Sequence, residues 1–353
     1  MVWLLTAFVC IGCGGVYWLR HHETRPSPSR NGAVPRAVVN SSPRSQIRTA
    51  VRADSLPEGA FVSESSAYPR PPRSLLEAQI ALDREGISPG SFDGRLGVQT
   101  RLAILAFQKK LNLVPSGVPD AETRQRLLLF VAPLTVYRVT SNDLARLQSL
   151  GKTWTAKSQQ SALEYETVLE LVAEKSHSHP ACIRSLNPDV DWTNVAAGLS
   201  LNLPAVVSAA PVSKAAFVRI SILDKTMEAF DEATNLLLHF PCSIAQRVEK
   251  RPIGQLHVET IAPQPNYTFD PELFPESAEA LQMSGKLILP PGPNNPVGSV
   301  WVGLDRTGYG IHGTPNPEQV GRTESHGCFR LANWNAERLL GYCWIGMPVY
   351  VDP

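Results

Sequence analysis

The chain lacks features that mark several large classes of protein. Its 353 residues carry 33 Lys and Arg against 32 Asp and Glu, so it has no basic excess of the kind found in nucleic-acid-binding chains. Hydrophobic residues make up 43% of the chain, and only one uncharged apolar run is long, which excludes a disordered or multi-span membrane protein. Of its six cysteines, Cys10 and Cys13 lie in the apolar N-terminal run, and the other four show no Cys-x-x-Cys spacing, which argues against a zinc ribbon. The length predicts about two to three domains.

Charge is also absent from the first 19 residues. As a helix, residues 2–19 would span roughly 27 Å, close to the thickness of a bilayer core. We therefore expect residues 1–19 to be a membrane anchor or signal segment. Arg20, Arg25 and Arg30 follow this run, and by the positive-inside rule they would place the bulk of the chain in the cytoplasm.

Residues 20–73 have no lysine and no apolar periodicity. They contain nine Arg against four acidic residues, together with eight Pro and nine Ser. Such a segment buries too little apolar surface to offset its chain entropy. We expect a disordered Pro/Ser/Arg-rich linker.

Residues 74–132 are predicted to form three short helices. Leu76 and Ile80 mark the first, a second begins at Thr100, and Asp120 is a candidate N-cap for a third that carries Leu127. The order Phe92-Asp93-Gly94, Gly97, Thr100, Phe107-Gln108, Gly117 and Asp120 resembles the peptidoglycan-binding domain 1 family. The alternative is a generic helical spacer.

Residues 133–206 are predicted to form a small α/β domain. Tyr137 lies in a possible strand, and Thr167 to Val172 in a helix. From Leu186-Asn187-Pro188 to Pro204 the sequence resembles the second half of a lysin-motif (LysM) domain, which implies either glycan binding or a structural spacer. His177 and His179 have no third metal ligand nearby, so we expect them to be exposed loop residues.

Residues 214–353 contain successive short strands separated by turns rich in Gly and Pro. The strands are expected at 217–222, 227–230, 236–240, 287–289, 299–304 and 348–351. This pattern predicts a mostly antiparallel, sandwich-like β domain. The fold class of the whole chain is therefore α+β multidomain. The Pro-rich stretch from Pro263 to Pro296 is predicted to be a functional loop, either a lid or a substrate wall, rather than a disordered insertion.

One segment carries residues suited to acyl transfer. Cys328 lies within 16 positions of two histidines, His312 and His326, and a thiol acts as a nucleophile once a neighbouring imidazole accepts its proton. Gly327 would let backbone N–H groups approach an acyl oxygen. If residues 328–331 are extended, Arg330 projects from the same face as Cys328. The alternatives are a buried structural cysteine or a zinc site made by His312, His326 and Cys328.

The segments His312-Gly313-Thr314 and Ser325-His326-Gly327-Cys328-Phe329-Arg330-Leu331 resemble the signature of the YkuD-type L,D-transpeptidase family. The resemblance implies Cys328 as the nucleophile and His312 as the proton donor and acceptor. It implies supporting or oxyanion-hole roles for Ser325, His326 and Gly327, and substrate binding by Arg330, Gly313 and Thr314. It also implies a thioester with a peptidoglycan stem, release of terminal D-alanine and transfer to an amine. No metal or other cofactor is implied.

The resemblances together imply an enzyme of the cell envelope or periplasm that acts on peptidoglycan stems and glycan and is anchored to the inner membrane by residues 2–19. An L,D-carboxypeptidase, a non-catalytic peptidoglycan-binding protein and a cytoplasmic thiol enzyme remain alternatives. Export would also permit a Cys182–Cys242 disulfide.

Overall fold

The computed structural model describes residues 67–207, 211, 213–274, 277–323 and 327–353. The predicted anchor, residues 1–19, and most of the predicted linker lie outside the described residues. No helix in the part that is described has both the length and the apolar character needed to cross a membrane.

The three predicted helices between residues 74 and 132 are present. They are α1 (Leu75–Arg84), α2 (Val98–Lys110) and α3 (Ala121–Arg126). Ser74 caps α1 and Asp120 caps α3, because each side chain accepts a hydrogen bond from a backbone N–H in the first turn. The second helix begins at Val98 rather than at Thr100. Leu127 lies just past the end of α3, and there it packs into the core of this domain.

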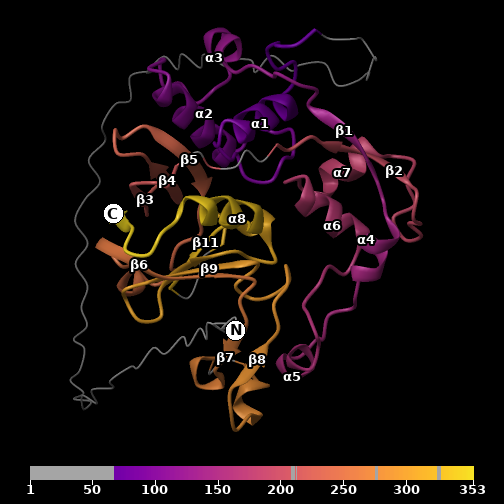
Figure 1. Ribbon diagram of the computed structural model, residues 1–353, viewed down its shortest axis with the longest axis vertical. Helices are drawn as coiled ribbons and strands as arrows, with labels where there is room; N and C mark the ends of the chain where they lie inside the picture. Colours follow the sequence, from indigo (N-terminus) through magenta and orange to yellow (C-terminus); the bar gives the residue numbers. More distant parts are fainter. Residues whose placement is uncertain (1–66, 208–210, 212, 275–276, 324–326) are drawn as a thin grey trace, which may run out of the picture. The chain divides into compact units, whose positions relative to one another are not determined.

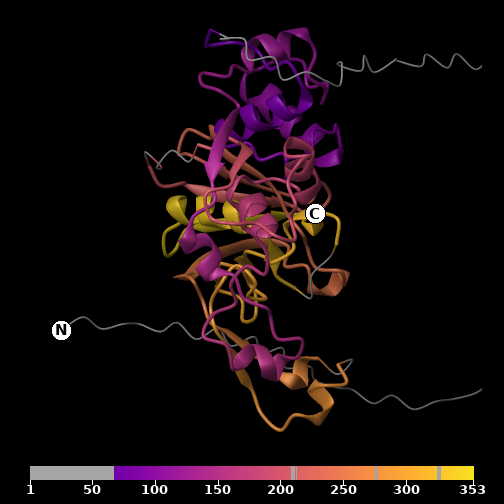
Figure 2. The ribbon, with the colours of Figure 1, turned by 90° about the vertical axis from the view of Figure 1, so that its right-hand side faces the viewer.

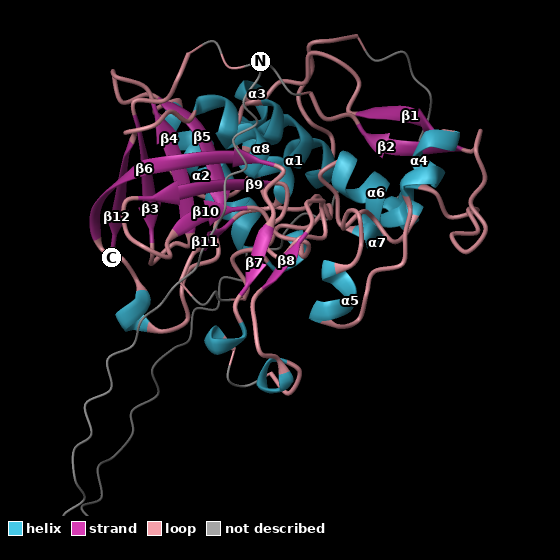
Figure 3. Cartoon of the chain, turned by 60° about the horizontal axis from the view of Figure 1, so that its bottom comes forward, coloured by secondary structure: helices cyan, strands magenta, loops and turns pink. Residues whose placement is uncertain are grey.

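Residues 133–206 form a small α/β unit. Strands β1 (Leu134–Arg138) and β2 (Ser200–Pro204) pair antiparallel, and Figure 3 shows both strands with the helices that separate them in sequence. These helices are α4 (Ser141–Arg146), α5 (Trp154–Ser158), α6 (Val168–Lys175) and α7 (Pro180–Leu186). Thr167 caps α6, where the sequence predicts a helix. The resemblance of this unit to a lysin motif stays a prediction.

The C-terminal domain is built on one eight-stranded sheet with the order β11-β10-β9-β6-β12-β3-β4-β5, whose strands are labelled in Figure 3. Its pairings are antiparallel except for β12 with β3 and β10 with β11. The strands are β3 (Phe217–Ser221), β4 (Thr226–Phe230), β5 (Leu236–Pro241), β6 (Gly254–Pro263), β9 (Val300–Leu304), β10 (Gly310–His312), β11 (Phe329–Arg330) and β12 (Pro348–Asp352). The prediction of a mostly antiparallel β domain is confirmed. The long strand β6 and the short strands β10 and β11 were not predicted.

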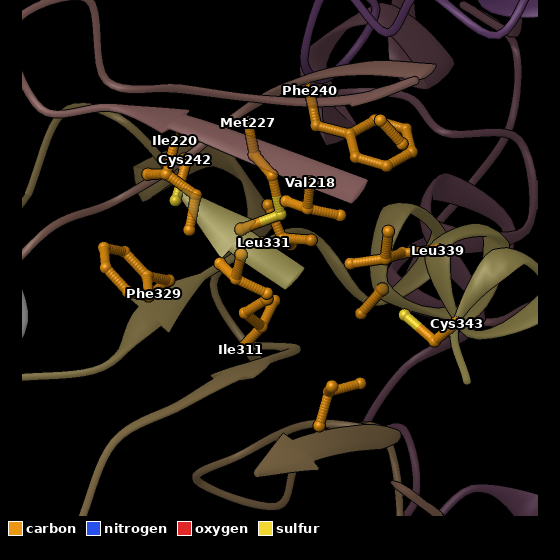
Figure 4. Close-up of a cluster of buried hydrophobic side chains, with 14 of the residues drawn as sticks. Val218, Ile220, Met227, Phe240, Cys242, Ile311, Phe329, Leu331, Leu339 and Cys343 are labelled. Carbon is orange, nitrogen blue, oxygen red and sulfur yellow. The ribbon is translucent and has the colours of Figure 1, made fainter. Parts of the chain in front are cut away.

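The sheet curls around its own core. Strand β6 pairs with β12 along one edge and with β9 along the other, so it belongs to both halves of the sheet. Its register with β9 shifts between Val258 and Thr260, which bends it there. Side chains from both halves, and from helix α8 (Asn333–Tyr342), meet in one buried cluster (Figure 4) that includes Val218, Ile220, Met227, Phe240, Ile311, Phe329, Leu331 and Leu339.

The Pro-rich stretch from Pro263 to Pro296 is largely structured. Strands β7 (Tyr267–Phe269) and β8 (Leu287–Leu289) pair antiparallel, with single 3-10 turns η2 (Pro271–Leu273) and η3 (Ala280–Gln282) between them. Further 3-10 turns are η1 (Val248–Lys250) and η4 (Pro317–Gln319). The β7–β8 hairpin lies beside α5 in both Figure 1 and Figure 2. Trp154 stacks on Phe269 with 4.3 Å between ring centroids, and Glu279 accepts the Trp154 backbone N–H at 2.9 Å.

A buried ionic cluster joins all three folded segments. The carboxylate of Asp83 on α1 accepts hydrogen bonds from Arg338 on α8, at 3.0 and 3.2 Å, and lies 3.3 Å from His177 Nδ1. Burial raises the pKa of Asp83, but His177 and Arg338 outweigh it and hold that pKa below its ordinary value. The prediction that His177 is an exposed loop residue is therefore wrong, since only 8% of it is exposed and its ring stacks on Trp334.

Removing one member of this cluster is expected to be costly. Asp83→Leu leaves the Arg338 guanidinium buried without its carboxylate, so the free energy of unfolding should fall by about 3–5 kcal/mol. Chemical denaturation measures the loss. The double variant Asp83→Leu/Arg338→Met, which removes both charges, should recover part of it. A single variant as stable as the wild type would contradict a structural role for the cluster.

Candidate active site

Strand β10 brings the predicted catalytic histidine next to the predicted nucleophile. It pairs antiparallel with β9 and parallel with β11, so His312 lies opposite Trp301 on one side and Arg330 on the other. Cys328 stands directly before β11. Phe329 and Leu331 are buried in the core, whereas Cys328 and Arg330 both line a cavity. This is the alternation expected of an extended segment.

The cavity has a volume of about 380 Å³. It is lined by His312, Gly327, Cys328 and Arg330 together with Trp154, Lys250, Tyr267, Leu273, Phe274, Pro296, Val297, Gly308 and Tyr309. Cys328 is half-buried, and its Sγ donates to the carbonyl oxygen of Gly308 at 3.5 Å. The imidazole and the thiol therefore face one chamber, as a proton transfer between them requires.

The tautomer of His312 is set by its backbone neighbour. His312 is 6% exposed, and its Nδ1 lies 2.6 Å from the carbonyl oxygen of Gly313. A carbonyl oxygen can only accept, so Nδ1 carries the proton. In the neutral ring, Nε2 then keeps its lone pair and acts as the base. The ring also stacks on Trp301, with 5.7 Å between centroids.

Burial keeps this base uncharged. It lowers the pKa of His312 to about 4. The hydrogen bond to Gly313 works in the opposite direction, and the positive charge of Arg330 lowers the pKa further. Near neutral pH the imidazole is therefore ready to accept a proton. A thiol attack assisted by a neutral base fits this site better than a resting imidazolium.

The other described cysteines are not available for this chemistry. Cys182, Cys242 and Cys343 are buried free thiols, so the Cys182–Cys242 disulfide that export would permit is not formed in this structure. Burial raises the pKa of all three, to about 11 for Cys182 and about 12 for Cys343. Cys328 is the least buried of the four described thiols.

The remaining predicted site residues fall into three groups. Gly327 lines the cavity with Cys328, whereas Gly313 contributes its carbonyl oxygen to His312. Thr314 lines an adjoining cavity of about 80 Å³, which Arg330 also lines. Ser325 and His326 lie outside the described residues. No group of three or more His, Cys, Asp or Glu side chains that could hold a metal occurs among the residues described.

Sequence reasoning missed the aromatic wall of the cavity. Tyr267 and Phe274 come from the Pro-rich stretch, Tyr309 from the turn before β10, and Trp154 from α5 in the middle segment. The sequence predicts a lid or a substrate wall in the Pro-rich stretch, but no spacing singles out these rings. Burial is the main cause that raises the pKa of Tyr267, and the nearby Cys328 adds to it.

Asn333, at the start of α8, was also missed. It is fully buried; its Oδ1 accepts the Ser299 N–H at 3.2 Å, and its Nδ2 donates to the Pro293 carbonyl oxygen at 3.1 Å. A β-carbon on Gly298 or Gly313 would collide with Oδ1. The glycine after His312 is thus required by the close approach of this amide, which braces the turn that holds the histidine.

Both folded ends of the chain match known families. Residues 215–351 match the YkuD family, described as the L,D-transpeptidase catalytic domain, and residues 73–127 match a family described as "Putative peptidoglycan binding domain". The chain is 24% identical to "Putative L,D-transpeptidase YkuD" of Bacillus licheniformis, over 53% of this chain and 94% of that protein. It is 39% identical to "Putative L,D-transpeptidase YqjB" of Bacillus subtilis, over 17% of this chain and 36% of that protein.

Solved structures are similar over parts of the chain. An L,D-transpeptidase from Xylanimonas cellulosilytica is 15% identical, with a TM-score of 0.32, covering 82% of this chain and all of that one. The Enterococcus faecium L,D-transpeptidase C442S mutant is 16% identical, with a TM-score of 0.30, over 40% of this chain. This chain covers about half (51%) of that structure.

The lowered pKa of His312 predicts an unusual pH dependence. Protonation removes the base, so activity should persist as the pH falls through 6.5 and fail only as it approaches 4. Nuclear magnetic resonance of ring-labelled histidine in the Cys328→Ala chain would follow the titration directly. Arg330→Gln should raise the midpoint, because the opposing positive charge is gone. A midpoint at or above 6.5 would show that the ring is not buried as described.

Proposed function

We propose a mechanism for a chain whose residues 215–351 are an L,D-transpeptidase catalytic domain and whose residues 73–127 are a peptidoglycan-binding domain. The function is that of a peptidoglycan L,D-transpeptidase. The observation that carries the mechanism is that His312 and Cys328 line one cavity, with Nε2 left as the base.

In the first half of the reaction, Sγ of Cys328 attacks the carbonyl carbon that links the third residue of a stem peptide to its terminal D-alanine. The thiol proton passes to Nε2 of His312, and a tetrahedral oxyanion forms. When the oxyanion collapses, the carbon–nitrogen bond breaks, and the imidazolium gives its proton to the departing amine. D-alanine leaves, and the stem remains on the enzyme as a thioester.

In the second half, an amine from another stem or from a protein lysine attacks the thioester. His312 removes a proton from this amine and returns it to the sulfur as the new amide bond forms. Water in place of the amine would give a shortened stem, which is L,D-carboxypeptidase action. The reaction therefore needs two reactants to enter the cavity one after the other. Cys328 is only half-buried and lines the cavity, so each reactant can reach its sulfur.

The residues around the thiol would stabilise charge. We assign the backbone N–H groups of Gly327 and Cys328 to the oxyanion, because glycine before the nucleophile leaves room for the acyl oxygen. Ser325 and His326 would support them. Burial lowers the pKa of Arg330, but its guanidinium stays protonated at neutral pH and can bind a stem carboxylate. Thr314 and Gly313 would contact the same stem, since Thr314 lines the adjoining cavity beside Arg330.

Acylation and crosslinking by the full-length chain test this mechanism. A carbapenem should add its mass to the peptide that contains Cys328, and purified muropeptides should yield crosslinked dimers with release of D-alanine. Cys328→Ala should abolish both, and His312→Ala should slow acylation by about 10²–10⁴-fold.

Cys182→Ala is the matched control. That thiol is buried and does not line the cavity, so its removal should leave labelling unchanged. Shortened stems without dimers would favour the carboxypeptidase. Absence of both labelling and product in the wild-type chain would leave only a peptidoglycan-binding role.

For location, we propose the cell envelope, with residues 2–19 as an anchor to the inner membrane. The support is the length of the apolar run and a substrate that lies outside the cytoplasm. A reporter enzyme fused after Leu19 that is active only in the periplasm is the expected result. Activity confined to the cytoplasm would remove the chain from mature peptidoglycan and contradict both parts of this proposal.

A further inference from the structure

A second cavity, of about 410 Å³, lies where the peptidoglycan-binding domain meets the catalytic domain. It shares no lining residue with the catalytic cavity. One wall comes from the start of α2 and the loop before it, and the opposite wall from β5, the β3–β4 turn and the segment at Gly321. Its size is that of a small-molecule site, and its walls combine apolar residues with polar and charged ones.

The two walls are held together by backbone pairing. The N–H of Ser88 donates to the carbonyl oxygen of His239 at 2.8 Å, and the N–H of His239 donates to the carbonyl oxygen of Gly86 at 3.0 Å. Gly86 has a φ of +80°, and a β-carbon there would press against the backbone of β5. These hydrogen bonds fix the distance between the two walls of the cavity.

Each wall contributes a buried polar atom that has no hydrogen-bond partner among the described residues. They are Oγ of Ser91 on one side and Nε2 of His239 on the other. The His239 side chain is only 3% exposed, and its Nδ1 lies 2.9 Å from the Glu228 carboxylate. Buried polar atoms are nearly always paired in native proteins, so two unpaired atoms on residues that line one cavity point to a ligand that pairs with them.

The side chains that line the cavity indicate which chemical groups the ligand carries. The carboxylate of Glu228 accepts, so Nδ1 of His239 carries a proton, and Nε2 is left to pair with the ligand, as an acceptor in the neutral ring or as a donor in the protonated one. A hydroxyl or an amide group can pair with either form, and the Ser91 hydroxyl can donate or accept. Lys225 and Arg322 line the cavity and suit a carboxylate, while Asp93 and Asp224, which line it too, suit N–H and O–H donors. Hydroxyl, amide and carboxylate groups occur together in a saccharide that carries a peptide.

The cavity is connected to the strand that bears Arg330. The side-chain amide of Gln99 on α2 donates to the carbonyl oxygen of Val320, and the next residue, Gly321, donates its N–H to Ser243 Oγ at 2.9 Å. Ser243 and Arg330 then exchange two backbone hydrogen bonds, at 2.9 and 3.0 Å. A ligand in this cavity is held beside Gly321, whose hydrogen bond to Ser243 leads on to Arg330.

We propose that this junction cavity is a binding site for a peptidoglycan fragment, a saccharide with its stem peptide, formed jointly by the two domains. The proposal rests on the proposed function for the nature of the ligand. Ser91 and His239 bind hydroxyl and amide groups, and Lys225 and Arg322 bind a stem carboxylate. The peptidoglycan-binding domain thus contributes only half of its own site, and the catalytic domain completes it.

Calorimetric titration of the full-length Cys328→Ala chain with a purified disaccharide-tetrapeptide tests the site without turnover. Ser91→Ala should raise the dissociation constant by about three- to tenfold, the effect of losing one hydrogen bond. Because the hydroxyl has no protein partner, its loss should leave the melting temperature unchanged. Ser161→Ala, at an exposed serine outside the cavity, is the matched control and should bind as the parent does.

A second variant blocks the cavity without removing a contact. A β-carbon at Gly97 would meet no atom within 4 Å, so Gly97→Phe adds a ring at the wall with little strain and should reduce binding more than tenfold. Separate titrations with a tetramer of N-acetylglucosamine and with the free stem tetrapeptide identify which part of the fragment carries the Ser91-dependent affinity.

The outcomes separate this site from the catalytic mechanism. Unchanged binding in both Ser91→Ala and Gly97→Phe would overturn the junction site, while carbapenem labelling of Cys328 in the wild-type chain would stand. Ser91-dependent binding, together with no carbapenem labelling of Cys328 in the wild-type chain, would uphold the junction site and contradict the proposed catalytic mechanism.

Discussion

The hydrogen bond from His312 to the carbonyl oxygen of Gly313 decides what the thiol next to it can do. It places the ring proton on Nδ1, so the lone pair of Nε2 is left for the cavity that Cys328 shares. Three other features of the site keep that hydrogen bond in place. Strand β10 holds the histidine between β9 and β11, Trp301 covers one face of its ring, and the Asn333 amide fixes the turn that supplies the carbonyl oxygen. This hydrogen bond therefore makes Nε2 of His312 a proton acceptor on the side of the cavity.

Local sequence patterns were enough to predict much of the architecture. A helix cap acts within one turn, so its signal is short-range, and the N-cap predicted at Asp120 is confirmed. Ser74 and Thr167 cap the first helix and α6, which the sequence predicts from their apolar residues rather than from these caps. Most of the longer strands were also predicted, with the exception of β6. Strands β10 and β11 were not, because two or three residues carry no period, and their pairing depends on a partner far along the chain.

The site was predicted only in part, for a related reason. Cys328 and His312 stand in short motifs whose chemistry is legible from residue type. Tyr267, Trp154 and Asn333 reach the site by tertiary packing, which no spacing in the sequence encodes. His177 shows the same limit in reverse: its sequence neighbours suggest an exposed loop, but the Asp83 carboxylate from another domain makes it a buried residue.

The middle segment does more than separate the two ends. Glu174 on α6 accepts a hydrogen bond from Asn333 at 3.0 Å, and burial raises the pKa of Glu174 to about 8, with Glu337 and Glu170 adding to the effect. A carboxyl from this segment is thus protonated over much of the neutral range, and it contacts the Asn333 that braces the turn after His312. Since α5 supplies Trp154 to the cavity as well, the candidate active site is assembled from two segments of the chain.

The pairing of residues 86–88 with β5 has a consequence for how such a chain can change over time. Strand β5 is the last strand in the sheet order, and the peptidoglycan-binding domain supplies hydrogen bonds that its outer side would otherwise lack. A catalytic domain that lost this neighbour would present an open row of N–H and C=O groups, the surface on which strands of separate molecules add to one another. Gaining the helical domain therefore covers the outer side of β5, whereas losing that domain exposes it and favours aggregation.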